Sequence, residues 1–337
     1  MKHNISKTKK SKNAQSVKTL KTRHKLALTG TPIENSLAEL WSIFDFLMPQ
    51  YLFNYHYFQK QYENDIVKNN DEEKTKQLKK LVTPFILRRN KKEVLTELPD
   101  KIEQNMILPF NDEEEKIYVA NLAKANKELQ ELYDLEGSDK MQILKLLTRL
   151  RQLCLEPRLV YDNIDQPSSK LKACMELIKT MQENKQKVLL FSSFTSVLDL
   201  IAEECQKAGI TYYMLTGSTN KEDRRELVSR FQKDDTTLFL ISLKAGGTGL
   251  NLTSAEVVIH FDPWWNVSAQ NQATDRAYRI GQKNNVQVFN LVMKDSVEEK
   301  IIELQKRKKE LADMFVENNS GGLSQMSKED ILSLFTM

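Results

Sequence analysis

Two arginines in the last quarter of the chain carry its most specific chemical signal. Residues 272–282 read Gln-Ala-Thr-Asp-Arg-Ala-Tyr-Arg-Ile-Gly-Gln, with Arg276 and Arg279 three positions apart. We expect this stretch to be helical, so that the spacing places both guanidinium groups on one face. Such planar, permanently charged groups are suited to stabilising the charge of a phosphoryl group during transfer. The alternative is a solvated helix with two surface arginines, which is the commoner role of such pairs.

A glycine-rich loop is the second candidate. Residues 242–252 read Ser-Leu-Lys-Ala-Gly-Gly-Thr-Gly-Leu-Asn-Leu. Glycines allow the backbone to approach a ligand or a neighbouring element closely, although a tight turn with positive φ would need them as well. Thr248 and Asn251 add polar groups that a turn does not require, and they favour the ligand.

An alternating pattern of strands and helices has to position these residues. Intervals that fit helices of 12–15 residues separate five short apolar runs, as in βαβ units with a parallel sheet. The runs are Val188–Phe191, Tyr212–Leu215, Leu238–Ile241, Val257–Phe261 and Val286–Val292. We therefore expect residues 170–300 to form one compact parallel α/β lobe. Ligands bind beyond the carboxyl ends of such strands, and three loops leave these ends: Ser192–Thr195, Ser242–Asn251 and Asp262–Asn266.

The region before residue 160 follows a different pattern. Apolar residues at helical spacing predict that residues 50–160 are mainly helical and lie outside any sheet; one stripe comprises Ile143, Leu146, Leu147, Leu150 and Leu153. Further upstream we expect a short strand at Leu26–Leu28 and a helix that Ser36 caps and Pro49 ends. Asp165–Ser169 is predicted to be a linker.

Six segments, in order, resemble the Snf2 family of DNA-translocating ATPases in helicase superfamily 2. Leu-Thr-Gly-Thr-Pro-Ile-Glu-Asn at 28–35 is similar to the family's third helicase motif. The segments at 84–89 and 98–103 resemble the bridge between its two lobes. Those at 189–195 and 215–219 resemble motifs IV and IVa. Residues 242–252 together with Asp-Pro-Trp-Trp-Asn at 262–266 resemble motif V and its extension.

The resemblance implies a role for particular residues. Arg276 and Arg279 would act on the γ-phosphate of ATP across the cleft between the lobes. The other roles that it implies are nucleotide binding by Gly247, Gly249, Asn251 and Gln272, DNA binding by Ser193, Gly217, Ser218, Ser242 and Lys244, and coupling of the lobes by Thr29, Gly30, Thr31 and Trp264. Hydroxyls, backbone N–H groups and a lysine suit phosphate contacts that do not read bases. One of Trp264 and Trp265 is expected in the core and the other at the lobe interface or on DNA.

The implied fold is a RecA-like (P-loop NTPase-type) α/β lobe with a parallel sheet, preceded by mainly helical insertions. The expected divisions are 1–49, the end of a first RecA-like lobe; 50–165, helical insertions and the inter-lobe bridge; 166–316, the second lobe with a C-terminal helix; and 317–337, a tail.

Two parts of a nucleotide site are missing from the sequence. A G-x-x-x-x-G-K-[ST] loop, which holds the β- and γ-phosphates, does not occur, nor does Asp-Glu-x-His for Mg²⁺. Since the family carries both ahead of the segment at 28–35, we interpret the chain as the C-terminal part of a longer ATPase, either an expressed fragment or a truncated gene product. A non-catalytic DNA- or protein-binding module derived from such an ATPase is the alternative. ATP and Mg²⁺ are the expected cofactors of the complete enzyme, and no metal ligands are expected in this chain.

Composition narrows the class of protein further. Charged residues make up 28% of the chain, apolar residues 40%, and no apolar run approaches a membrane span. Cys154, Cys174 and Cys205 are widely spaced, as in reduced thiols. Residues 1–25 carry nine Lys or Arg and no acid, which suggests phosphate contact, but the resemblance favours the alternative that this segment is a severed edge of the first lobe. The expected partners are double-stranded DNA without sequence preference, the missing N-terminal lobe and a DNA-bound protein substrate, but no membrane. The expected location is the cytoplasm with the nucleoid in a bacterium, or the nucleus in a eukaryote.

The purified 337-residue chain is predicted to show negligible ATPase activity with or without DNA, because nothing in its sequence binds the β- and γ-phosphates together with Mg²⁺. A steady-state phosphate-release assay with duplex DNA tests this. Robust DNA-stimulated turnover would contradict it.

Overall fold

The computed structural model describes residues 12–20, 22–28, 37–69, 71–87, 89, 98–134, 140–246, 249–315, 334 and 335. The chain divides into two compact units: one comprises Met1–Val94 and Gln305–Met326, and the other comprises Leu95–Leu304 and Ser327–Met337. Among the described residues, no helix has both the length and the apolar character needed to cross a lipid bilayer.

The first unit is helical where it is described. It contains α1 (Lys12–Lys18), α2 (Leu37–Leu47), α3 (Tyr55–Phe58), a π-turn (Gln59–Glu63), α4 (Asn64–Asn69), α5 (Glu72–Val82) and a 3₁₀ turn (Thr83–Phe85). Its core includes Trp41, Phe44 and Phe58, and the Trp41 indole donates to the carbonyl of Phe53 at 3.1 Å. The predicted helix before Pro49 is therefore confirmed, while its cap, Ser36, lies outside the described residues.

The expected strand at Leu26–Leu28 is wrong. Only Leu28 forms an isolated bridge, and the side chains of Leu26 and Leu28 are 81% and 68% exposed. Without burial of these side chains, little stabilises an extended ladder here.

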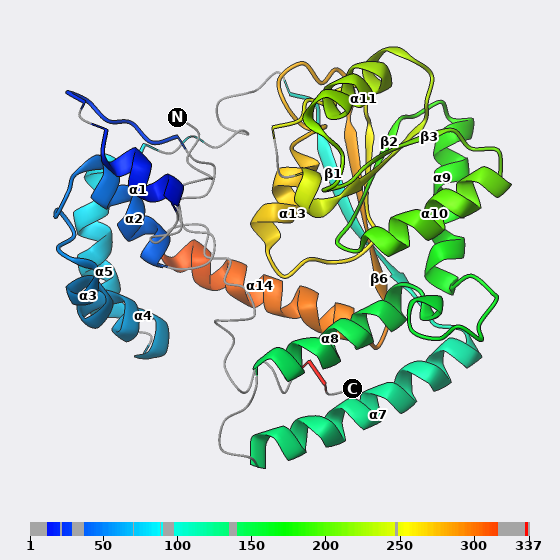
Figure 1. Ribbon diagram of the computed structural model, residues 1–337, viewed down its shortest axis with the longest axis horizontal. Helices are drawn as coiled ribbons and strands as arrows, with labels where there is room; N and C mark the ends of the chain where they lie inside the picture. The colour runs from blue at the N-terminus through cyan, green and yellow to red at the C-terminus, as the bar shows by residue number, and fades with distance from the viewer. Residues whose placement is uncertain are drawn as a thin grey trace. The chain divides into compact units, whose positions relative to one another are not determined.

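The second unit is built on a six-stranded sheet in which every pairing is parallel (Figure 1). The strand order is β1-β6-β5-β2-β4-β3. The strands are β1 (Lys101–Leu108), β2 (Val188–Ser192), β3 (Tyr212–Leu215), β4 (Leu238–Ser242), β5 (Val257–His260) and β6 (Val286–Met293). All five predicted strands are confirmed. The sixth, β1, contradicts the expectation that residues 50–160 lie outside any sheet.

Helices cover both faces of this sheet (Figure 1). Successive residues of β2 alternate between two cores, as the period of two in a strand requires: Val188 and Leu190 face one, and Leu189 and Phe191 the other. Residues of α9 (Ser169–Glu183) and α10 (Thr195–Lys207) line the first core. Residues of α11 (Lys221–Lys233), α12 (Leu243–Gly246) and α13 (Val267–Thr274) line the second.

Two long helices and the first part of a C-terminal helix complete the second unit. The long helices are α7 (Asp112–Asp134) and α8 (Lys140–Leu155), and a 3₁₀ turn (Pro157–Leu159) follows α8. The C-terminal helix is α14 (Val297–Phe315), whose residues up to Leu304 belong to this unit and whose residues from Gln305 belong to the first. The predicted apolar stripe of α8 is confirmed by Ile143, Leu147, Leu150 and Leu153, which are all buried. Ser168, in the predicted linker, caps α9 by accepting from the backbone N–H of Leu171 at 3.0 Å.

A fully buried ion pair joins the start of α9 to the start of α14. The Lys170 ammonium lies 2.7 Å from both carboxylate oxygens of Glu298. One of these oxygens also accepts from the backbone N–H of Met293, the last residue of β6, at 2.8 Å. Burial raises the pKa of the Glu298 carboxyl, while Lys170 opposes the shift.

Lys170→Met is predicted to lower the free energy of unfolding by about 3–5 kcal/mol, because it leaves the Glu298 carboxylate buried without its cation. Arg230→Met is the matched control. Its partner, Glu226, is one turn away on the exposed face of α11, and the expected loss is below about 1 kcal/mol. Urea unfolding measures both. Equal losses would contradict the prediction, whereas recovery in Lys170→Met/Glu298→Leu would support it.

His260, the last residue of β5, is another buried titratable group. Its ring stacks on Phe191 with centroids 5.6 Å apart, and its Nε2 lies 2.9 Å from the Thr274 hydroxyl at the end of α13. Burial lowers the pKa of His260 from 6.5 to about 4, although Glu103 and Asp262 oppose the shift.

This histidine is predicted to make the fold sensitive to acid. As the pH falls below 6.5, the unfolded chain binds the proton first, so the stabilisation is complete above pH 6.5 and is lost as the pH falls through about 4. The loss amounts to ~3 kcal/mol. Urea unfolding across this range should show a smaller decline for His260→Gln than for the wild type, while the exposed His56→Gln should behave as the wild type. Identical declines for His260→Gln and the wild type would sink the prediction.

Candidate functional site at the carboxyl ends of the strands

Three neighbouring strands bring the predicted DNA-binding residues to one edge of the sheet. Ser193 follows β2, Gly217 and Ser218 follow β3, and Ser242 and Lys244 lie at and after the end of β4. Because β2, β4 and β3 are adjacent and parallel, these loops leave the same edge.

These residues differ in how accessible they are. Gly217, Ser218 and Lys244 are exposed, Ser193 is half-buried, and Ser242 is buried at 5% exposure. The Ser218 hydroxyl lies 2.8 Å from that of Thr216 within the turn after β3. The exposed hydroxyl of Ser218 and ammonium of Lys244 are therefore better placed for phosphate than the hydroxyl of Ser242.

The first glycine of the glycine-rich segment 242–252 is Gly246, and packing requires it to be glycine. A Cβ on Gly246 would lie 2.8 Å from Cε1 of Phe191, so this glycine allows α12 to approach β2. Gly247 and Thr248 lie outside the described residues. Gly249 is exposed with φ +24°, and Asn251 is exposed, its backbone carbonyl accepting from the side chain of Gln232 at 2.7 Å.

The prediction that Arg276 and Arg279 lie on a helix is wrong. Helix α13 ends at Thr274, and successive turns follow, in which the N–H of Arg276 donates to the carbonyl of Ala273 and that of Arg279 to the carbonyl of Ala277. Bonds to the glycine loop compete with a continued helix. The carbonyl of Arg276 accepts from the N–H of Leu252 at 2.9 Å, and Nη1 of Arg279 donates to the carbonyl of Leu250 at 2.8 Å.

The turns nevertheless hold the two guanidinium groups near one another. Both side chains are half-buried. Burial lowers the pKa of Arg276, and the neighbouring Arg279 cation lowers it further, whereas Asp275 opposes the shift. Like charges in a partly dehydrated setting repel, and an anion between them would relieve that repulsion. Gln272, one turn earlier on α13, is half-buried as well.

A buried ion pair lies at the centre of this edge. Asp262, just after β5, is buried, and its Oδ2 lies 2.8 Å from Nη2 of Arg151 on α8. Its Oδ1 accepts from the Ser192 hydroxyl at 2.8 Å and from the N–H of Ser193 at 3.0 Å, and the Ser193 hydroxyl donates to Oδ2. The carboxylate thus joins the ends of β2 and β5 to α8.

Three aromatic rings surround the Arg151 guanidinium. Its Cζ lies 5.0 Å from the ring centroid of Phe194, 5.4 Å from that of Trp264 and 5.6 Å from that of Trp265. Both tryptophans are half-buried and face the same cation. The role of Trp264 in coupling lobes stays a prediction, and Thr29, Gly30 and Thr31 lie outside the described residues. One signal in the sequence pointed to this cluster: Arg151 lies four residues after Leu147, beside the apolar stripe of α8.

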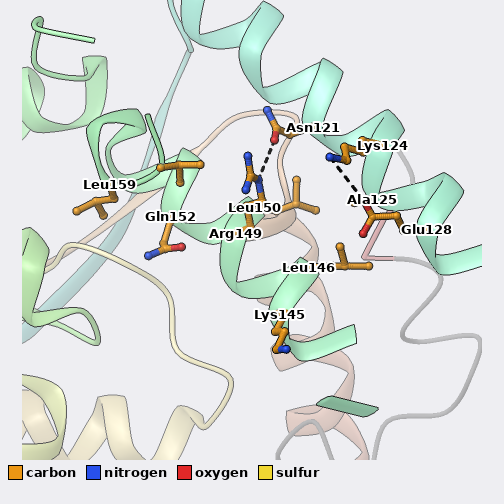
Figure 2. A pocket seen from close by; sticks show the side chains of 11 residues that line it. Asn121, Lys124, Ala125, Glu128, Lys145, Leu146, Arg149, Leu150, Gln152 and Leu159 are labelled. Carbon is orange, nitrogen blue, oxygen red and sulfur yellow. Dashed lines mark hydrogen bonds and ion pairs between the residues drawn. The ribbon is translucent and has the colours of Figure 1, made fainter. Parts of the chain in front are cut away.

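A cavity of about 430 Å³ lies between α7 and α8 (Figure 2). Arg149 points across it toward Asn121, whose Oδ1 accepts from Nε of Arg149 at 3.0 Å. None of its lining residues belongs to the candidate site. Among the described residues, no group of three or more His, Cys, Asp or Glu side chains could hold a metal ion.

Comparisons with known proteins agree with this arrangement. Residues 2–159 match the SNF2-related domain, and residues 169–281 match the helicase conserved C-terminal domain. A putative ATP-dependent helicase/translocase of Bacillus subtilis is 37% identical over 335 residues, which cover 97% of this chain and 36% of that protein. An uncharacterized ATP-dependent helicase of Mycoplasma pneumoniae is 38% identical over 311 residues, covering 92% of this chain and 29% of that protein. The chain thus spans about a third of the length of these curated relatives.

A solved structure extends the likeness to the fold. The Sulfolobus solfataricus SWI2/SNF2 ATPase core in complex with double-stranded DNA is similar with a TM-score of 0.59 and 33% identity, over 98% of this chain and 70% of that one. The predicted fold class, a RecA-like parallel sheet lobe preceded by a mainly helical region, is confirmed. With both domain matches in the expected order, the chain belongs to the Snf2 family.

Proposed function

We propose that this chain forms the C-terminal motor part of an Snf2-type, DNA-stimulated ATPase that translocates on duplex DNA and remodels protein–DNA complexes. One observation carries the proposal. The turns with Arg276 and Arg279 are bonded to the glycine loop through Leu250 and Leu252, at the edge where the candidate DNA-binding loops also leave the sheet. Groups suited to a triphosphate and groups suited to a DNA backbone therefore share one face of one lobe.

The two guanidinium groups fit the phosphates of a nucleotide. They are half-buried and close enough for one charge to lower the pKa of the other, as expected of a site for a multiply charged anion. ATP would supply the transferred phosphoryl group, and Mg²⁺ would neutralise part of its charge. In this scheme Arg276 and Arg279 stabilise the charge that develops during transfer, while the exposed backbone at Gly249 allows close approach.

The DNA contacts would involve the phosphate backbone. Ser218 and Lys244 present an exposed hydroxyl and an exposed ammonium, which suit phosphate oxygens and carry no sequence information. Binding of this kind weakens steeply with salt, because each neutralised phosphate releases counterions. The similar archaeal core was solved with double-stranded DNA, which supports duplex DNA as the partner.

In the full-length gene product, Arg276→Ala and Arg279→Ala are each predicted to lower DNA-stimulated turnover by roughly 10³–10⁵-fold. Binding of ATP and DNA should change little, because the arginines act mainly on the transition state. Lysine should not restore activity at either position, since it lacks the planar fork. Steady-state ATPase assays with saturating duplex DNA measure turnover, and fluorescence titrations measure binding of both ligands.

Arg230→Ala on the exposed face of α11 is the control for loss of an arginine as such. Thermal melting must show that Arg279→Ala folds, because this change also removes the bond to the carbonyl of Leu250. Near-normal turnover in both alanine variants would overturn the assignment. DNA binding by a full-length protein with no ATPase activity would instead favour a non-catalytic binding module.

A further inference from the structure

We propose that Arg151 is a positioning residue that couples DNA contact at Ser193 to the placement of Arg276 and Arg279. The proposal rests on the proposed function, because it assigns to one buried cation the link between the DNA side and the nucleotide side of the lobe. Arg151 lies on α8, in the helical region, and its side chain is buried at 7% exposure.

The Ser193 hydroxyl is the point at which DNA can act. A serine hydroxyl has one proton to donate, and here it is donated to Oδ2 of Asp262. This hydroxyl can therefore donate a hydrogen bond to a DNA phosphate only if it turns away from Oδ2 of Asp262. The same hydroxyl lies 3.0 Å from Nη2 of Arg151, so its rotation changes both members of the ion pair.

Arg151 determines how Asp262 responds. Its Nη2 lies 2.8 Å from Oδ2 of Asp262 and 3.5 Å from the carbonyl of Pro263, and the side chains of Arg151 and Asp262 are 7% and 1% exposed. When the Ser193 hydroxyl turns to the phosphate, the Arg151 guanidinium remains as a donor to Oδ2. A buried carboxylate that loses one donor is held more strongly by the other. The segment starting at Asp262 is then drawn toward α8.

A short, firmly held segment leads from Asp262 to the arginines. Asn266 caps α13, its side chain accepting from the N–H of Ala269 at 3.2 Å, and the helix ends at Thr274, bonded to His260. A helix of eight residues is about 12 Å long and moves as a rigid rod. Movement at its first residue is therefore passed to the turns that hold Arg276.

The alternative is that Arg151 only stabilises the fold. Lysine separates the two roles, because it keeps the charge opposite Asp262 but loses the planar group that stacks between the aromatic rings and reaches several acceptors. Arg149→Lys is the matched control. Arg149 lies on the same helix, bonds the side chains of Asn121 and Tyr161, and lines the cavity between α7 and α8.

The first experiment uses this chain alone and needs no ATPase activity. The chain has three tryptophans, so Trp41→Phe leaves Trp264 and Trp265, the two beside Arg151, as its fluorophores. Titration with duplex DNA should change their emission. The change should be lost in Arg151→Lys and kept in Arg149→Lys, with the variants melting as the parent does. No DNA-dependent change in the parent, or an equal change in Arg151→Lys, would overturn the proposal.

The second experiment measures ATPase activity in the full-length gene product. Arg151→Lys should lower DNA-stimulated kcat about tenfold while the KM for ATP and the Kd for DNA change by less than about twofold. Arg149→Lys should match the wild type. Asp262→Asn keeps the shape of the side chain but removes its charge, so it should show the same loss of DNA-stimulated kcat. This variant replaces Arg151→Lys in the test if Arg151→Lys does not fold. Wild-type stimulation in both Arg151→Lys and Asp262→Asn would overturn the coupling role alone, whereas failure of the proposed function would appear as full activity in Arg276→Ala.

Discussion

The buried ion pair between Lys170 and Glu298 is the interaction on which the second unit is assembled. Removing two charges from water costs several kcal/mol for each ion, and such a pair persists only where the geometry satisfies both partners. Here Lys170 contacts both oxygens of Glu298, and the N–H of Met293 completes the set. Nearby, the N–H of Val297 donates to the hydroxyl of Tyr118 at 2.8 Å, so α7, α9, β6 and α14 meet at this point.

This pair also supports the candidate site from within the core. The Lys170 ammonium lies 5.3 Å from the ring centroid of Phe261, and the next residue is Asp262. Asp262 is close enough to contribute to the raised pKa of Glu298. Two buried carboxylates, each with its own cation, thus lie close to Phe261. The first pair connects α9 to β6 and α14, and the second joins the strand ends to α8.

How far the sequence predicted this structure depended on burial. The five interior strands were apparent because a parallel sheet with both faces covered requires nearly continuous apolar runs. The sequence of the edge strand β1 did not predict a strand, because one side of an edge strand faces solvent and its residues can remain polar. In β1, Glu103, Gln104 and Asn105 interrupt the apolar residues, and most of the strand is exposed.

The site was predictable in its residue types and not in its local geometry. The order of the loops and the parallel topology placed the candidate residues at one edge, as expected. Turns stand in place of the helix predicted around Arg276 and Arg279, and these residues bond instead to Leu250 and Leu252. No local sequence pattern predicts these two partners. Arg151 and Asp262 lie 111 positions apart, and such a pairing follows only from the packing of α8 against the sheet.

The position of β1 has a consequence for how the protein can be divided. The match to the helicase C-terminal domain begins at residue 169, yet β1, at 101–108, pairs along the whole length of β6. A fragment cut at the start of that match would uncover one edge of a strand that is buried almost throughout, and the N–H and C=O groups of β6 that pair with β1 would lose their partners. Such an edge recruits strands from other molecules. The unit that folds with a protected edge is therefore longer than the helicase C-terminal match, and it includes a strand from the preceding SNF2-related match.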